Sequence, residues 1–229
     1  MPKDLAADAG RPGLPEVGEQ LRERRLALNL SVRELARRLN VSPSLISQIE
    51  RGKATPSVGT LYSMTTELGL SMGTLFDEPG TGESGPNFQT ALAALNAPGE
   101  NGDRPSTTTV NPVVGPDDRN RIQLASGVIW ERLTPTTDPN VDFLEVLYQS
   151  GGASCEADAL VRHAGREYGH VLSGTLGVTL GFETYVLGPG HSISFDSTIP
   201  HRLATIGNEP VRAIWFVVGR LGDSRSVSG

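Results

Sequence analysis

Residues 41–57 read VSPSLISQIERGKATPS, and this stretch decides how the N-terminal part of the chain folds. Ser42 is a favourable N-cap and Pro43 a favourable first residue of a helix, so a helix begins here, and Gly52 ends it. Just upstream, Asn40 tolerates the left-handed conformation that a sharp turn between two helices needs. The stretch therefore predicts the turn and the second helix of a helix-turn-helix unit.

Helix signals continue on both sides of this unit. Ser31 caps a preceding helix, and Glu34 three residues later is typical of a capping box. Ser57 caps a following helix that Gly69 closes, and Ser71 caps a short last one. These signals, with a periodic apolar pattern near the N-terminus, predict a domain of five helices. It covers residues 16–78, with helices over residues 16–28, 32–39, 43–51, 58–68 and 72–76.

The third predicted helix has one apolar face and one polar face. Its polar residues recur at i, i+3, i+4 and i+7, which places them on a single stripe. A solvated face is the ordinary alternative, but this stripe has short hydroxyl and amide side chains rather than alternating Glu and Lys. Arginines and capped helix N-termini that can receive phosphates flank it. We therefore expect the stripe, which consists of Ser44, Ser47, Gln48 and Arg51, to face a nucleic acid.

The charge distribution supports this expectation. The whole chain of 229 residues has a formal net charge of -6, which argues against a protein that coats nucleic acid through its bulk charge. Residues 21–55, however, hold eight basic and three acidic residues, a net charge of +5, so the remaining 194 residues carry -11. The basic residues are thus concentrated in the predicted helical domain.

Other classes of protein are excluded by what the sequence lacks. A single cysteine, Cys155, forms neither an internal disulfide nor a cysteine-based zinc cluster, and we expect it to be an inert small residue. The apolar runs fall far below the roughly 18 residues that span a bilayer, and residues 1–13 lack the apolar core of a signal peptide. We therefore expect a cytoplasmic protein without a membrane partner.

The helical residues resemble the Cro/C1-type (XRE-family) helix-turn-helix domain of phage repressors and their bacterial relatives. The resemblance implies that the third helix enters the major groove of double-stranded DNA, where Gln48 can pair with adenine. It also implies a structural pair between Arg25 and Glu50. Residues nearest the base edges would be Pro43, Ser44, Ser47 and Gln48, and residues at phosphates would be Ser31, Arg33, Arg51, Lys53 and Thr55.

Downstream of this domain the pattern changes twice. Residues 79–120 are rich in Gly and Pro and predict a flexible linker, and residues 1–15 and 221–229 predict disordered tails. From residue 121 to residue 220, period-two alternation and close turns predict an all-β sandwich or barrel, with Trp130, Trp215, Phe143 and Phe195 in its core. Strands are expected over residues 141–148, 176–180, 184–187, 191–195 and 211–218.

Two stretches of the β-rich part resemble the halves of the cupin signature. The first is HAGREYGHVLSG over residues 163–174, and the second surrounds His201. The resemblance implies a cupin barrel in which His163, Glu167 and His201 match three of the family's ligand positions. Val161 replaces a fourth, usually a histidine.

The chemistry of these three residues leaves alternatives open. Two histidines and a carboxylate can hold a divalent metal ion such as iron(II), and zinc also accepts three protein ligands. The same side chains could instead bind an organic effector or hydrogen-bond one another.

Together, the two parts predict a transcription regulator rather than an enzyme. The N-terminal domain would bind a pseudo-palindromic operator as a homodimer, and the cupin barrel would sense a small-molecule effector. One alternative is a metal-dependent cupin enzyme, an oxygenase or isomerase, that carries a DNA-binding head; Val161 weighs against it. Another is an antitoxin-like repressor without a ligand. Because the linker is long, regulation requires some contact between head, linker and barrel that the sequence does not identify.

Overall fold

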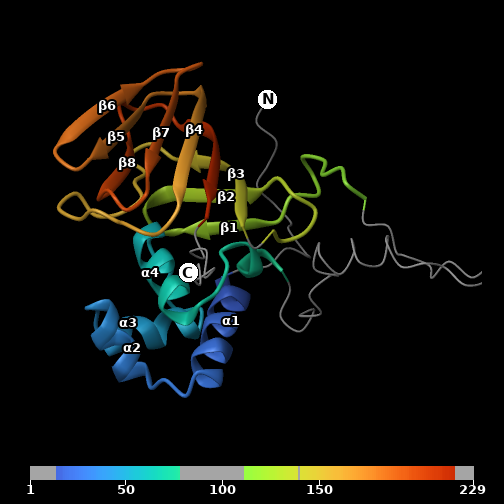
Figure 1. Ribbon diagram of the computed structural model, residues 1–229, viewed down its shortest axis with the longest axis vertical. Helices are drawn as coiled ribbons and strands as arrows, with labels where there is room; N and C mark the ends of the chain where they lie inside the picture. Colours follow the sequence, from blue (N-terminus) through green and yellow to red (C-terminus); the bar gives the residue numbers. More distant parts are fainter. Residues whose placement is uncertain (1–13, 78–110, 139, 220–229) are drawn as a thin grey trace, which may run out of the picture.

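A computed structural model describes residues 14–77, 111–138 and 140–219, which form a helical head and a β-barrel (Figure 1). The predicted tails and most of the predicted linker lie outside the described residues. In the described part of the chain, no helix combines the length and apolar character that a membrane crossing needs.

The head contains four α-helices and a short 3₁₀ helix, not the five helices that the sequence predicts. The last predicted helix is the 3₁₀ element, because its amides reach back only three residues, from Thr74 to Ser71 and from Leu75 to Met72. The elements are α1 (Leu14–Ala27), α2 (Val32–Leu39), α3 (Pro43–Glu50), α4 (Val58–Leu68) and η1 (Gly73–Phe76).

The predicted caps set the helix ends. The hydroxyls of Ser31, Ser42 and Ser57 each accept a hydrogen bond from the amide three residues later. Asn40 and Gly69 follow α2 and α4 in the left-handed conformation, with φ of 53° and 62°. The local sequence signals therefore place α2, α3 and α4 to within a residue.

The barrel consists of two antiparallel sheets. The larger has the strand order β1-β2-β3-β9-β4-β7 and the smaller the order β6-β5-β8. Three of the predicted strands (β3, β5 and β9) have the predicted bounds, β6 begins one residue earlier than predicted, and β7 is shifted by one residue at both ends. Four strands were not predicted: β1, β2, β4 and β8. The strands are β1 (Arg121–Leu124), β2 (Val128–Arg132), β3 (Val141–Tyr148), β4 (Arg166–Ser173), β5 (Leu176–Leu180), β6 (Glu183–Leu187), β7 (Ser192–Asp196), β8 (His201–Thr205) and β9 (Val211–Val218).

The barrel core lies between the two sheets. Trp130, Trp215 and Phe195 are buried there, as the sequence predicts. Phe143 is only half-buried and stacks on Phe216, its register partner on β9, with ring centroids 4.2 Å apart. The prediction of a core position for Phe143 is therefore wrong, because its side of β3 faces out of the barrel.

The head is in direct contact with the barrel, although the long linker suggested a loose tether. Figure 1 shows α4 against the barrel and α2 and α3 at the end of the head away from it. The amide of Gly59 in α4 donates to the carbonyl of Ser154 at 3.1 Å, and the amide of Ala125 donates to the carbonyl of Pro56 at 2.9 Å. Backbone hydrogen bonds thus join the barrel to the first residues of α4 and to the residues just before them.

A second attachment lies at the end of the head. Arg132 of β2 is buried, and its Nη1 donates to Oδ1 of Asp77 at 2.6 Å and to the carbonyl of Gly73 at 3.2 Å. The hydroxyl of Thr137 donates to Oδ2 of Asp77 at 2.6 Å, and Asn120 donates to the carbonyl of Phe76 at 2.8 Å. These bonds join residues 73–77 to the barrel.

Candidate functional site

The predicted DNA-facing stripe lies on the open side of α3. Pro43, Ser44, Gln48 and Arg51 are exposed and Ser47 is half-buried. The amide of Gln48 donates to the hydroxyl of Ser44 at 3.3 Å, which is a weak bond that a base edge can replace. Contact between these side chains and DNA stays a prediction.

The residues expected at phosphates surround this stripe. Ser31 caps α2 and Arg33 lies in its first turn, and Arg51, Lys53 and Thr55 follow α3. Thr55 is half-buried, and the other four are exposed. The barrel attaches to the head at Pro56 and beyond, so it leaves this surface open.

A buried ion pair holds the recognition helix in place. Arg25 Nε lies 2.6 Å from Oε1 of Glu50, and Arg25 Nη2 lies 2.8 Å from Oε2. Arg25 also donates to the carbonyl of Leu30 at 2.7 Å. The structural pair that the resemblance implied is thus confirmed, and it joins α1 to the last residue of α3.

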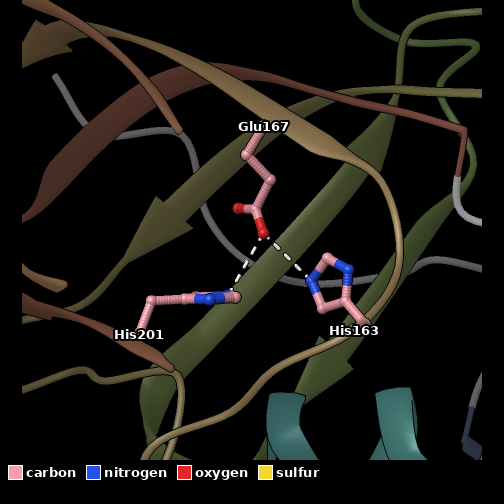
Figure 2. Close-up of side chains that lie close together, drawn as sticks. All are labelled: His163, Glu167 and His201. Carbon is pink, nitrogen blue, oxygen red and sulfur yellow. Dashed lines mark ion pairs between the residues drawn. The ribbon is translucent and has the colours of Figure 1, made fainter. Parts of the chain in front are cut away.

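Inside the barrel, the three expected ligand residues converge on one point (Figure 2). Nε2 of His163 and Nε2 of His201 lie 2.9 Å and 3.1 Å from the same oxygen of Glu167, Oε1. Glu167 lies on β4 and His201 begins β8, whereas His163 lies in the segment before β4. All three side chains are buried.

The hydrogen bonds on the far side of each imidazole determine what this cluster can hold. Nδ1 of His163 lies 2.9 Å from the carbonyl of Ala164, and Nδ1 of His201 lies 2.8 Å from the carbonyl of Ile199. Because a carbonyl only accepts, both Nδ1 atoms carry a hydrogen. In a neutral imidazole, the Nε2 atom then carries no hydrogen. The lone pairs of both Nε2 atoms therefore point at the same carboxylate oxygen.

Three converging acceptors need a positive charge between them. Protonated imidazoles supply one solution: burial raises the pKa of Glu167, but hydrogen bonds from His163 and His201 outweigh burial and hold that pKa well below its usual range. Burial likewise lowers the pKa of His201, but the hydrogen bond to Glu167 outweighs it and the pKa is raised. A metal cation is the other solution.

The donor set fits a divalent metal ion. One ligand atom from each residue can be chosen so that all three lie within 4.8 Å of one another. The remaining carboxylate oxygen of Glu167 accepts a hydrogen bond from Nε1 of Trp215 at 2.7 Å. With the backbone carbonyls at each Nδ1, this bond orients the ligands as the outer partners of metal ligands do.

Trp215 is a site residue that the sequence analysis placed only in the core. Its ring lies across Gly169, the register partner of Trp215 on β4. A Cβ at residue 169 would lie 2.1 Å from Cζ3 of Trp215, so only glycine allows this approach. A glycine inside a strand is the one signal that indicates a close contact there.

The head closes the cavity beside this cluster. Val58 and Tyr62 of α4 complete a lining that otherwise consists of barrel residues. The Tyr62 ring stacks on the His163 ring, with centroids 4.4 Å apart and planes 4° apart, and meets Trp130 edge-on at 5.4 Å. Sequence reasoning missed Tyr62, because an aromatic residue on an apolar helix face has the same pattern as any core residue.

Comparisons with known proteins support both domain assignments. The family model described as a helix-turn-helix matches residues 21–75, and the one described as a cupin domain matches residues 144–217. The HTH-type transcriptional regulator PuuR of Escherichia coli K12 is 28% identical over 186 residues, which cover 80% of this chain and 84% of PuuR; PuuR of Shigella flexneri matches to the same extent.

One solved structure shows the same fold. An HTH_3 family transcriptional regulator from Vibrio cholerae matches with a TM-score of 0.57 and 22% identity, over 89% of this chain and 95% of that one. Hydroxypropylphosphonic acid epoxidase from S. wedmorenis matches with a TM-score of 0.40 and 20% identity, over 90% and 99% of the two chains. The chain therefore joins an N-terminal helix-turn-helix domain to a C-terminal cupin domain, and over most of its length it is similar to HTH-type transcriptional regulators.

Proposed function

We propose that this protein is a cytoplasmic, sequence-specific transcription regulator that binds an operator through its head and senses a small molecule in its barrel. The observation that carries the proposal is the position of the head between two sites. Its α2 and α3 present an open surface of hydroxyl, amide and basic side chains, and its α4 closes the cavity of the barrel.

The operator contacts follow from the exposed surface of α3. Gln48 would read an adenine through its amide, with Pro43, Ser44 and Ser47 beside it at the base edges. The surrounding residues would bind phosphates and set the register without reading sequence. They are Ser31, Arg33, Arg51, Lys53 and Thr55.

A homodimer would match this mode of recognition. Each head offers one recognition helix, and two heads related by a two-fold axis bind two half-sites about one helical turn apart. The operator would then be a pseudo-palindrome.

The barrel site would be built on its three converging side chains. A divalent ion, if bound, would be held by Nε2 of His163, Oε1 of Glu167 and Nε2 of His201, and it would supply a Lewis acid with open positions for donor atoms of an effector. The chain itself would orient the ligands through Trp215 and two backbone carbonyls, and α4 would cover the cavity.

The converging acceptors also favour a second candidate, a metal-dependent cupin enzyme that carries a DNA-binding head. This candidate requires stoichiometric iron, manganese or nickel in the purified protein, lost in His201→Ala, together with turnover of a substrate. Metal without turnover would favour the sensor, in which the ion only anchors an effector.

Selection of bound sequences from a random duplex library tests the regulator proposal. The full-length protein should enrich a pseudo-palindrome, and Gln48→Ala should lose the preference at one position of each half-site. Gln123→Ala, the same change at an exposed residue of β1, serves as the control and should select the original operator. No enrichment by the wild-type protein, or an unchanged preference in Gln48→Ala, would contradict the respective part of the proposal.

A further inference from the structure

We propose that the face of His163 inside the barrel is a binding subsite for an aromatic ring, that Tyr62 of the head occupies it as an internal ligand, and that a small aromatic effector releases the head by taking the place of Tyr62. This inference rests on the proposed function, because it assigns the regulation of the head to the same barrel site.

Two barrel side chains shape the subsite. The imidazole of His163 lies parallel to the Tyr62 ring at 4.4 Å, and the indole of Trp130 meets that ring edge-on at 5.4 Å. Offset stacking and edge-to-face contact are the two arrangements that aromatic rings favour. The barrel therefore presents one wall for the face of a ring and another for its edge, and a planar ring from any source fits between them.

The cavity leaves no room for an organic molecule while Tyr62 is in place. It measures about 20 Å³, which is enough for about one water molecule. Sites for organic ligands are usually about 300 to 1,000 Å³ in volume. A molecule that reaches the cluster of His163, Glu167 and His201 must therefore displace part of the lining.

The movable part of the lining is α4. The other lining side chains belong to the barrel sheets and to segments bonded to them, whereas Val58 and Tyr62 come from the head. A ligand that opens the cavity from this side keeps the barrel core intact. Displacement of Trp130 or Trp215 would instead disrupt the core between the two sheets.

Displacement of the ring is coupled to release of the helix. Gly59 and Tyr62 lie three residues apart, on the same face of α4. At Gly59 the helix touches the barrel so closely that a Cβ would lie 2.4 Å from Cγ1 of Val161. A ligand ring that enters between Tyr62 and His163 pushes on this face, and the hydrogen bond from Gly59 to Ser154 is then lost with the stack.

The binding test uses p-cresol, which reproduces the side chain of tyrosine. Tyr62→Ala in the full chain should bind one p-cresol, measured by titration calorimetry, at least about tenfold more tightly than the wild-type protein, because the internal competitor is gone. Thr66→Ala, at an exposed residue of the same helix, is the matched control and should bind p-cresol like the wild type. Equal binding by Tyr62→Ala and the wild type would overturn the proposal.

A second variant covers the case in which Tyr62→Ala does not fold. Gly59→Ala keeps Tyr62 and improves helix propensity, but its methyl group collides with Val161 and so disfavours the attached head. It should therefore bind p-cresol more tightly than the wild type, although the residue that changed is not part of the subsite. Unchanged affinity would show that the position of α4 does not control access.

Release of the head is measured by hydrogen exchange at two amides that bond across the contact, those of Gly59 and Ala125. Saturating p-cresol should speed exchange at both amides in the wild-type protein, and the amide of Ala125 should exchange fast in Gly59→Ala without any ligand. The amide of Val171, bonded within the barrel to His191, should stay protected in each case. Binding of p-cresol with both contact amides still protected would contradict the release.

Neither measurement involves DNA. A failed operator selection with p-cresol binding as expected would therefore reject the regulator proposal alone, and the reverse result would reject the subsite alone.

Discussion

At the scale of single residues, the barrel site is defined by which atoms carry hydrogens. The carbonyls of Ala164 and Ile199 fix both imidazoles so that Nε2 of each faces Oε1 of Glu167. A proton or a metal ion at this point would therefore satisfy the three acceptors.

Glu167→Gln tests this property. The amide nitrogen of the new side chain can donate to one imidazole, so the metal-free variant should fold with a melting temperature no lower than that of the wild type. Its affinity for Zn²⁺, measured by calorimetry, should fall at least about a hundredfold, since loss of an outer partner alone costs about 10- to 100-fold. Glu183→Gln, on the exposed strand β6, should bind Zn²⁺ as the wild type does.

The resemblance to the cupin signature predicted His163, Glu167 and His201 as site residues, but it predicted neither Trp215 nor Tyr62. Histidines and a carboxylate at separated positions of a β-rich chain have few structural roles, so their pattern carries information. A buried aromatic residue can have many structural roles. Whether it contacts the site depends on strand register and on domain packing, which cannot be predicted from the sequence pattern.

At the scale of elements, the head owes its shape to caps and to one buried ion pair. The capping serines and the left-handed Asn40 and Gly69 are local signals, which is why the helices follow the prediction closely. The bond from Arg25 to Glu50 instead joins elements 25 residues apart. It orients α3 against α1 and thereby fixes the direction of the recognition helix.

Arg25→Ala should destabilise the head by about 3 to 5 kcal/mol, because it leaves the buried carboxylate of Glu50 without its partner. Arg37→Ala removes an exposed pair with Glu34 and should destabilise the head far less, because solvent screens that pair. Urea denaturation followed by circular dichroism measures both. A similar loss in the two variants would mean that the buried pair has no special role in the head.

The loop after α3 makes a separate prediction for binding. Lys53 is exposed beside the recognition helix, so Lys53→Ala should weaken binding to operator and random duplexes alike. The slope of log affinity against log salt should become less steep by about one unit, because one phosphate contact is lost. Fluorescence anisotropy at several salt concentrations measures the slope, and a loss confined to the operator would contradict the phosphate role.

Local sequence signals predict some strands of the barrel and miss others. The periodic pattern gave β3, β5 and β9 their bounds, whereas β4 was missed although it holds Glu167. Its buried positions include Glu167 and Gly169, and Leu172 is exposed, so apolar and polar residues do not alternate along its sequence. The same glycine that obscures the strand allows Trp215 to approach Glu167, so the functional contact and the missed prediction have one cause.

At the scale of the whole molecule, head and barrel are held together at α4 and at residues 73–77. The composition of the linker led to the expectation of a loose tether. Helical periodicity shows that α4 has a buried face but not whether the head or the barrel covers it. Contact between domains was for this reason the least predictable feature of the fold.

The attachment makes a prediction for thermal unfolding. The wild-type head and barrel should unfold in one calorimetric transition, because each stabilises the other. Gly59→Ala should separate the transitions, with the head melting several degrees lower, since about 1 kcal/mol corresponds to about 4 to 8 °C in a domain of 60 to 100 residues. Thr66→Ala is again the control, and a single transition in Gly59→Ala would show that the two domains do not depend on this contact.

The stack of Tyr62 on His163 has a further consequence for how sensitively an effector is detected. Because the tyrosine belongs to the same chain, it competes at a fixed effective concentration that does not change with the amount of protein in the cell. The concentration at which an effector acts is therefore set within the molecule, independently of expression level. Substitutions that weaken the contact of α4 with the barrel lower the effector concentration that is required, although no residue of the barrel changes. The DNA-binding domain thus sets the sensitivity of the barrel to its effector.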